Sequence, residues 1–157
     1  MATENKNLST YDKDSLPSVV GKRVGIITSQ WNGQITNNMR KGAVDTLLDC
    51  GFSPENIIEW SVPGAFELVN GAKRMIEKAV DAVIVIGCVI QGETKHFDFV
   101  CQGVTYGIAH LNATQDIPVI FCVLTYNTLQ QSIDRSGGKH GNKGIEAAIT
   151  AIQMIDL

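Results

Sequence analysis

Positive charge is not in excess in this sequence, and cysteine, aromatic residues and long apolar stretches are scarce. The 157 residues carry 13 Lys and Arg against 16 Asp and Glu, which gives a formal net charge of −3. A nucleic-acid-binding domain would instead present a basic patch or stripe. The apolar runs are short and broken by Gly and polar residues, whereas a transmembrane helix needs about 20 apolar residues in a row. We therefore expect no nucleic acid and no membrane among the partners.

Metal and cofactor chemistry also find little support. The four cysteines stand at positions 50, 88, 101 and 122 without a CxxC pair, and the three histidines at 96, 110 and 140. Such cysteines are typical of reduced, buried thiols rather than of a disulfide framework or a zinc site. A GxGxxG motif does not follow the first predicted strand, so a dinucleotide is not expected. We expect neither a metal nor an organic cofactor.

The chain divides into a short tail and one domain. Residues 1–20 are polar and contain Asn, Ser, Asp and Pro, which predicts an N-terminal tail that pairs with a neighbouring subunit. They lack the apolar stretch of a secretory signal, so a cytoplasmic location is expected. The remaining residues, 21–157, match the usual size of a single domain.

The apolar pattern of the domain alternates between strands and helices. It predicts strands at about 23–28, 57–62, 82–90 and 118–124, and helices at about 35–47, 66–76, 96–111, 129–135 and 145–154. The run AVIVIGCVI at 82–90 is apolar on both faces, as a central parallel strand should be. Strands that alternate with helices predict a parallel sheet covered on both faces. The expected fold is a three-layer α/β/α sandwich with a four-stranded parallel sheet, flavodoxin-like in type.

Ligands of such sheets bind beyond the carboxyl ends of the strands, which directs attention to the segment after the third strand. Gly92 allows the backbone to approach a ligand closely, and Thr94 is the predicted N-cap of the next helix. The free N–H groups of a helix start favour a phosphate or a carboxylate. His96 in the first turn could move protons there. The alternative is a surface histidine beside an ordinary helix start.

A second candidate anion site is the glycine-rich segment 136–144, which follows Arg135. Its composition resembles an anion-binding loop, but it lacks the GK-[ST] of a P-loop. The alternative is a flexible basic turn between two helices. Trp31, after the first strand, could stack on a flat ring or simply pack at the rim. Glu67 could accept hydrogen bonds from a polyol or complement a helix dipole.

Four motifs together resemble the 6,7-dimethyl-8-ribityllumazine synthase family. They are VPGAFE at 62–67, GETKHFDFV at 92–100, PVIFCVLT at 118–125 and GNKG at 141–144, and the resemblance extends roughly over residues 24–154. It implies the condensation of 5-amino-6-(D-ribitylamino)uracil with 3,4-dihydroxy-2-butanone 4-phosphate. The product is 6,7-dimethyl-8-ribityllumazine, with loss of phosphate and water. The implied route is imine formation, phosphate elimination and ring closure, without a cofactor.

The resemblance also assigns roles to individual residues. His96 matches the family's catalytic histidine, and Arg135 matches its phosphate-binding arginine. The backbone around Gly92, Glu93 and Thr94 completes the implied phosphate site. The implied pyrimidine and ribityl contacts are Trp31, Asn32, Ala65, Phe66, Glu67, Val89, Ile90, Phe121 and Lys143.

The family's site lies between neighbouring subunits of a homopentamer. Trp31 and the segments 65–67 and 92–96 would come from one chain, and Phe121, Arg135 and Lys143 from the next. Members of the family stop at pentamers, pair pentamers, or assemble twelve of them into a sixty-subunit shell. The short GGKHGNKG loop is similar to that of shell-forming members, and riboflavin synthase is a candidate partner.

Three positions depart from the family pattern. Gln91 stands where many members have Arg or Lys, so one positive charge near the phosphate is missing. Trp31 replaces the commoner Phe and preserves an aromatic surface, and His140 stands where a small residue is common. Two other functions remain to be weighed against the synthase. They are a flavin-binding module without catalysis and a purely structural shell protein.

Overall fold

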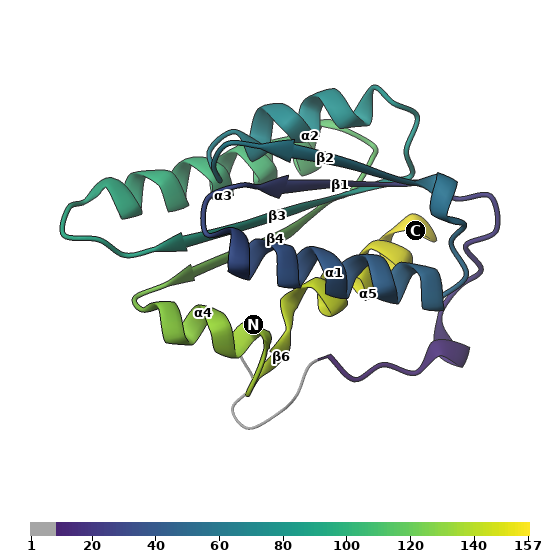
Figure 1. Cartoon of the computed structure of the whole chain (residues 1–157). Helices are drawn as coiled ribbons and strands as arrows, with labels where there is room; N and C mark the ends of the chain where they lie inside the picture. The colour runs from purple at the N-terminus through teal and green to yellow at the C-terminus, as the bar shows by residue number, and fades with distance from the viewer. Residues whose placement is uncertain (1–8) are drawn as a thin grey trace.

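A four-stranded parallel sheet forms the centre of the protein, whose structure is a computed structural model that describes residues 9–157. Its strands are β1 (Val24–Ser29), β2 (Ile57–Val62), β3 (Ala82–Ile90) and β4 (Val119–Tyr126). Their order across the sheet is β2-β1-β3-β4, and every pairing is parallel. All four carboxyl ends therefore meet at one edge, which is where the sequence predicts ligands to bind (Figure 1).

Helices cover both faces of the sheet (Figure 1). On one face lie α1 (Gly33–Asp49) and α5 (Lys143–Ile155), and on the other lie α2 (Leu68–Ile76) and α3 (His96–Thr114). The short α4 (Leu129–Arg135) follows β4 on the α1–α5 side. The predicted three-layer α/β/α sandwich is thus confirmed.

Two apolar clusters hold these layers together, one on each side of the sheet. Ile26 and Ile84 point toward α1 and α5, whereas Ile27 and Val85 point toward α2 and α3. Successive side chains of a strand face opposite sides of a sheet, so a strand covered by helices on both sides must be apolar throughout. This is why β3 has no polar side chain along its whole length and β1 has none from Val24 to Ile27.

Two segments near the predicted ligand edge differ from expectation. Helix α2 begins at Leu68 rather than near residue 66, because residues 63–67 form a separate turn. The predicted glycine-rich loop contains a small antiparallel hairpin, β5 (Ser136–Gly138) and β6 (Gly141–Asn142). Helix α5 then starts at Lys143, since the side chain of Asn142 accepts a hydrogen bond from Gly144 N at 2.8 Å and caps it.

The described part of the N-terminal tail packs on its own chain. It contains a short 3-10 helix, η1 (Lys13–Ser15), and a second one, η2 (Pro54–Asn56), precedes β2. Tyr11 donates a hydrogen bond to Asp49 at the end of α1 (2.9 Å), and Lys13 pairs with the same carboxylate at 3.3 Å. The tail thus runs along the layer of α1 and α5 (Figure 1). The predicted pairing of the tail with a neighbouring subunit concerns contacts between two chains, so it stays a prediction. Within residues 9–157, no helix combines the length and apolarity needed to cross a membrane.

Candidate active site

A cavity of about 640 Å³ opens at the carboxyl ends of β1, β2 and β3, between these strands and α3. Eight residues that the sequence predicted for the site line it: Trp31, Asn32, Ala65, Phe66, Glu67, Val89, Ile90 and His96. Four further lining residues were not predicted: Gly64, Cys88, Phe99 and Val100. The structure therefore gathers the ends of three strands and the start of α3 around one space, as the parallel topology demands.

Trp31 is presented to the cavity by the turn between β1 and α1. Its backbone N–H donates to Pro63 O at 3.1 Å, and Asn32 adopts a left-handed conformation with φ of 57°. The Asn32 side-chain amide donates to Cys88 O at 2.9 Å, which ties the turn to β3. One of the two amide N–H groups is thus used internally, and the other N–H and the oxygen are left to face a ligand. The Trp31 indole is 73% exposed, so its face is available for stacking on a flat ring.

The turn at 63–67 places Glu67 beside Trp31. Gly64 N donates to a Glu67 carboxylate oxygen at 3.0 Å. A Cβ on Gly64 would lie 2.9 Å from that oxygen and 3.5 Å from Trp31 Cδ1. The absence of a side chain at position 64 therefore leaves room for the Glu67 carboxylate against the backbone of the turn, next to the indole. The glycine of the VPGAFE motif has a steric reason that the sequence alone did not reveal.

His96 is the first residue of α3 and lines the cavity. The structure makes Lys95, not Thr94, the N-cap, and Lys95 offers no side-chain cap. Thr94 still supports the helix start, because its hydroxyl accepts from His96 N at 3.3 Å. A Cβ on Gly92 would meet nothing within 4 Å. Packing therefore does not demand glycine at position 92, and close approach of a ligand remains a reason for it.

Arg135 and Lys143 belong to a second group, built around the carboxylate of Glu146. Arg135 Nη1 lies 2.7 Å from Glu146 Oε1, and Lys143 Nζ lies 2.9 Å from Oε2. The same Nη1 donates a well-directed hydrogen bond to His140 O at 2.8 Å, whereas Oε1 receives none of good angle. The Arg135–Oε1 contact is thus chiefly an ion pair. The Glu146 carboxylate thus holds Arg135 and Lys143 near each other at the start of α5.

The burial of this group makes its charges depend on one another. Burial alone would raise the pKa of Glu146, but its interactions with Arg135 and Lys143 outweigh it, and the pKa is lowered. Burial likewise opposes the charged form of Arg135, yet Glu146 and Tyr126 raise its pKa above the ordinary value. Glu146 was not predicted for the site. The spacing of Lys143 and Glu146, three residues apart on one helix, was the signal that could have found it.

The two groups of predicted residues remain separate within one chain. Phe121 and Lys143 line another cavity of about 340 Å³, along the free edge of β4. Neither they nor Arg135 line the cavity that holds Trp31 and His96. Each half thus offers part of what the resemblance implies. One holds the predicted stacking wall and proton carrier, and the other holds Arg135, the predicted phosphate ligand, with Lys143, a predicted pyrimidine or ribityl contact.

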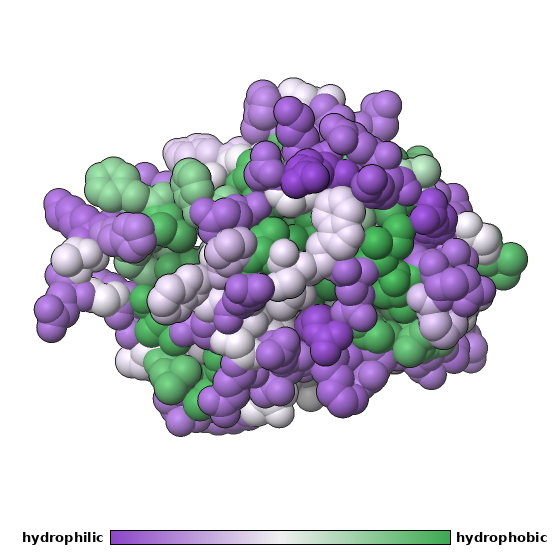
Figure 2. Space-filling view, turned by 45° about the horizontal axis from the view of Figure 1, so that its top comes forward, coloured by the Kyte–Doolittle hydropathy of each residue, from purple (hydrophilic) through white to green (hydrophobic). Residues whose placement is uncertain are grey.

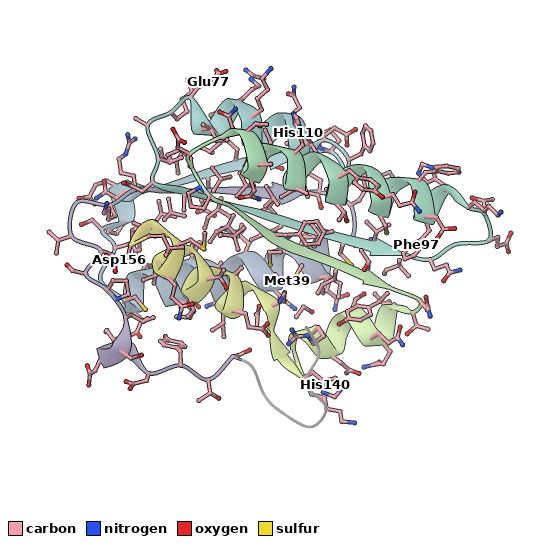
Figure 3. The ribbon with its side chains drawn as sticks, turned by 180° about the vertical axis from the view of Figure 1, so that it is seen from behind. Met39, Glu77, Phe97, His110, His140 and Asp156 are labelled. Carbon is pink, nitrogen blue, oxygen red and sulfur yellow. The ribbon has the colours of Figure 1, made fainter. Side chains whose placement is uncertain are left out.

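The sequence predicts reduced, buried thiols, and the structure confirms this in part. All four cysteines are free; Cys88 and Cys122 are buried, whereas Cys50 and Cys101 are only half-buried, which corrects the expectation of four buried thiols. Burial raises the pKa of Cys122 to about 12. His110 on α3 and His140 beside the start of α5 belong to opposite helical layers (Figure 3). Within residues 9–157, no three His, Cys, Asp or Glu residues lie close enough to hold a metal.

Comparison with known proteins identifies close relatives. The model of the family described as 6,7-dimethyl-8-ribityllumazine synthase matches residues 21–157. A protein of Flavobacterium johnsoniae that bears this name is 64% identical over 155 residues, which cover 98% of this chain and 82% of the relative. The proteins of the same name from Christiangramia forsetii and Parabacteroides distasonis are 57% and 54% identical. Their alignments cover 100% and 99% of this chain and 95% and 98% of the relatives.

Proposed function

The chain belongs to the 6,7-dimethyl-8-ribityllumazine synthase family, and we propose that it catalyses this reaction in riboflavin biosynthesis. The substrates would be 5-amino-6-(D-ribitylamino)uracil and 3,4-dihydroxy-2-butanone 4-phosphate. The observation that carries the proposal is the first cavity, in which the stacking aromatic, the VPGAFE turn and His96 meet. An enzyme of this kind has to hold a flat ring with a polyol tail and move protons beside it, and these side chains suit both tasks.

The flat pyrimidine would stack on Trp31, with its polar edge toward Asn32 and the backbone of Val89 and Ile90. Glu67, whose carboxylate already accepts one hydrogen bond from Gly64 N at 3.0 Å, would accept others from ribityl hydroxyls. Apolar walls from Phe66 and Phe99 would exclude water from the reacting atoms. Water exclusion favours imine formation, because that step itself releases water.

His96 would carry the protons that each step moves. The 5-amino nitrogen attacks the butanone carbonyl, water leaves, and an imine forms. Loss of a carbon-bound proton then expels phosphate, and the enol that remains tautomerises to a carbonyl. The ribitylamino nitrogen closes the ring on this carbonyl with loss of a second water. A positioned histidine contributes about 10²–10⁴ in rate to such transfers. Holding the two substrates together supplies much of the remaining acceleration.

The phosphate would bind between the backbone of Gly92, Glu93 and Thr94 and Arg135 of a neighbouring chain. We add Lys143 of that chain to the phosphate site, although the resemblance implies a pyrimidine or ribityl contact, because it shares the Glu146 carboxylate with Arg135. The separation of the two halves within one chain supports a site completed by a second subunit. Phe66, Phe99 and Tyr106 are 58%, 69% and 73% exposed. Apolar rings lie open on the face that carries α3 (Figure 2), and exposed apolar surface of this kind favours subunit contact. We propose a cytoplasmic homopentamer that assembles into a shell of twelve pentamers and contacts riboflavin synthase.

The direct test mixes purified protein with both substrates and follows lumazine by its fluorescence, against a control without protein. A rate well above that control is the expected result. Riboflavin binding without turnover, by protein that is demonstrably assembled, would favour the flavin-binding module. Assembly with neither binding nor turnover would favour a structural shell protein.

Replacing the proton carrier should slow the reaction without abolishing it. In His96→Ala, orientation by the cavity survives, while acid–base catalysis worth about 10²-fold or more is lost. The measurement is kcat at saturating concentrations of both substrates. His110→Ala, on the other end of α3, is the matched control. Equal rates for wild type and His96→Ala would reject the role given to His96.

Replacing the arginine should act on the phosphorylated substrate alone. Arg135→Ala removes a charge-assisted hydrogen-bond donor, worth about 1.5–3 kcal/mol. The KM for the butanone phosphate should therefore rise by about tenfold or more, while the KM for the uracil changes little. A change confined to the uracil would show that the phosphate binds elsewhere.

A further inference from the structure

We propose that Ser9 is a positioning residue. It holds Asn142 and, through Asn142, restricts the movement of Arg135 and Lys143. The proposal rests on the function proposed above, in which Arg135 and Lys143 bind the phosphate. It concerns the N-terminal strap, defined as residues 9–16, which the family motifs do not include. The strap reaches neither cavity described above, so its effect on the site would pass through Asn142.

Ser9 contacts the main chain of Asn142 at both of its polar groups. Asn142 N donates to Ser9 Oγ at 2.7 Å, and Ser9 Oγ lies within hydrogen-bond distance of Asn142 O at 3.2 Å. These contacts join residues 133 positions apart and are partly buried. The Ser9 hydroxyl thus contacts both the backbone N–H and the backbone carbonyl of Asn142, the residue before Lys143.

The side chain of Asn142 extends this clasp into the domain. Its carbonyl oxygen accepts from Gly144 N at 2.8 Å, and its amide donates to Asn38 O of α1 at 2.9 Å. The amide also sits directly against Gly42 of α1, where a Cβ would lie 2.6 Å from Nδ2. Asn142 therefore caps α5, ties it to α1 and is itself held by Ser9.

The contacts of Asn142 with Ser9 and α1 leave the start of α5 little freedom to move. A Cβ on Gly144 would collide with the main-chain carbonyl of Met39, so the two helices touch through their backbones. Met39 lies where α1 passes α5, close to the loop that carries His140 (Figure 3). The first turn of α5 carries Lys143 and Glu146, and Glu146 holds Arg135. The position of residue 142 thus sets the position of both cations.

A second attachment keeps the strap in place. In its middle, Tyr11 and Lys13 bind the Asp49 carboxylate at the end of α1 (2.9 and 3.3 Å). The hydrogen bonds from Tyr11 and Lys13 lower the pKa of Asp49. The strap therefore spans α1 from one end to the joint with α5, and Ser9 reaches Asn142 from an anchored segment.

Fixed hydrogen-bond donors bind an oxyanion better than mobile ones, because less conformational entropy is lost on binding. Loss of the Ser9 hydroxyl would leave Arg135 and Lys143 in place on average but less confined. The consequence is specific: phosphate affinity falls, while binding of the uracil to the other half of the site is unchanged. A purely structural role would lower thermal stability without this selectivity.

The test compares Ser9→Ala with Ser15→Ala in the full-length, assembled protein. Ser15 is a matched control, because its hydroxyl donates to Asp12 O within the strap at 2.7 Å and does not contact Asn142. Binding of inorganic phosphate is measured by calorimetry and amide hydrogen exchange at residues 141–144 by mass spectrometry. Where lumazine forms, the KM of each substrate is measured as well.

Ser9→Ala should raise the dissociation constant for phosphate about two- to tenfold, the range for loss of one typical hydrogen bond. It should speed exchange at residues 141–144, while Ser15→Ala leaves both unchanged and Ser9→Thr restores the wild-type values. Equal phosphate affinity in the two alanine variants, or equal loss in both, would overturn the proposal, as would absence of phosphate binding to the wild type. Phosphate binding that follows these expectations without lumazine formation would support the clasp and reject the proposed reaction.

Discussion

Glu146→Gln is the substitution that tests the electrostatics of the cationic group most directly. The Glu146 side chain is 12% exposed and lies 2.7 Å from Arg135, itself 13% exposed, and 2.9 Å from Lys143. Glutamine has the same shape but leaves two neighbouring cations without a counter-charge. Breaking a fully buried pair costs about 3–5 kcal/mol, and an exposed pair contributes about 0–1 kcal/mol. For a group in which Lys143 keeps partial contact with water, we expect a loss of about 2 kcal/mol.

A loss of this size corresponds to a fall in the midpoint of thermal unfolding of about 4–8 °C for a chain of this length. The assay is thermal unfolding at one fixed protein concentration, because subunit association also stabilises the folded state. Glu55→Gln, the same change at an exposed position of η2, is the control and should leave the midpoint unchanged.

The pH dependence gives the sharper test. Because the pKa of Glu146 is lowered in the folded protein from its ordinary value of 4.5, the unfolded chain binds this proton more readily. The stabilisation is therefore fully present above about pH 5 and is lost as the pH falls through the lowered value. The difference between wild type and Glu146→Gln should accordingly shrink between pH 7 and pH 4. A difference that stays constant or grows on acidification would refute this account.

Three glycines allow further tests of packing. Gly64→Ala would place a methyl group 2.9 Å from the Glu67 carboxylate and 3.5 Å from the Trp31 indole. We expect a rise of about tenfold in the KM for the uracil, with a small change in thermal midpoint; equal KM values would mean that the turn does not position these side chains. Gly144→Ala would force α5 away from the Met39 carbonyl and should cost about 3 kcal/mol or more. Gly92→Ala, with open space around its Cβ, should unfold like the wild type. Equal stability of the wild type, Gly144→Ala and Gly92→Ala would contradict the packing described for α1 and α5.

Local sequence patterns proved reliable where one periodicity dominated. The strands at 57–62 and 82–90 and the helix at 129–135 have the predicted bounds. Prediction failed where a side chain outside the periodic run decides a boundary. Asn142 starts α5 two residues early by capping it, and the glycine-rich segment pairs with itself as a hairpin. Neither capping geometry nor a hairpin of seven residues with an irregular register leaves a periodic apolar signal.

The sequence by itself determined the alternation of strands and helices, the parallel sheet with its apolar central strands, and the family through four ordered motifs. Those features depend on residues that are close together in the sequence, so the order of the residues is enough to predict them. Only the tertiary structure decided that Glu146 joins Arg135 to Lys143, that Gly64 makes room for Trp31 and Glu67, and that Ser9 holds Asn142. Each of these contacts depends on how separate elements pack against one another, and the spacing of residues in the sequence carries no direct record of that packing.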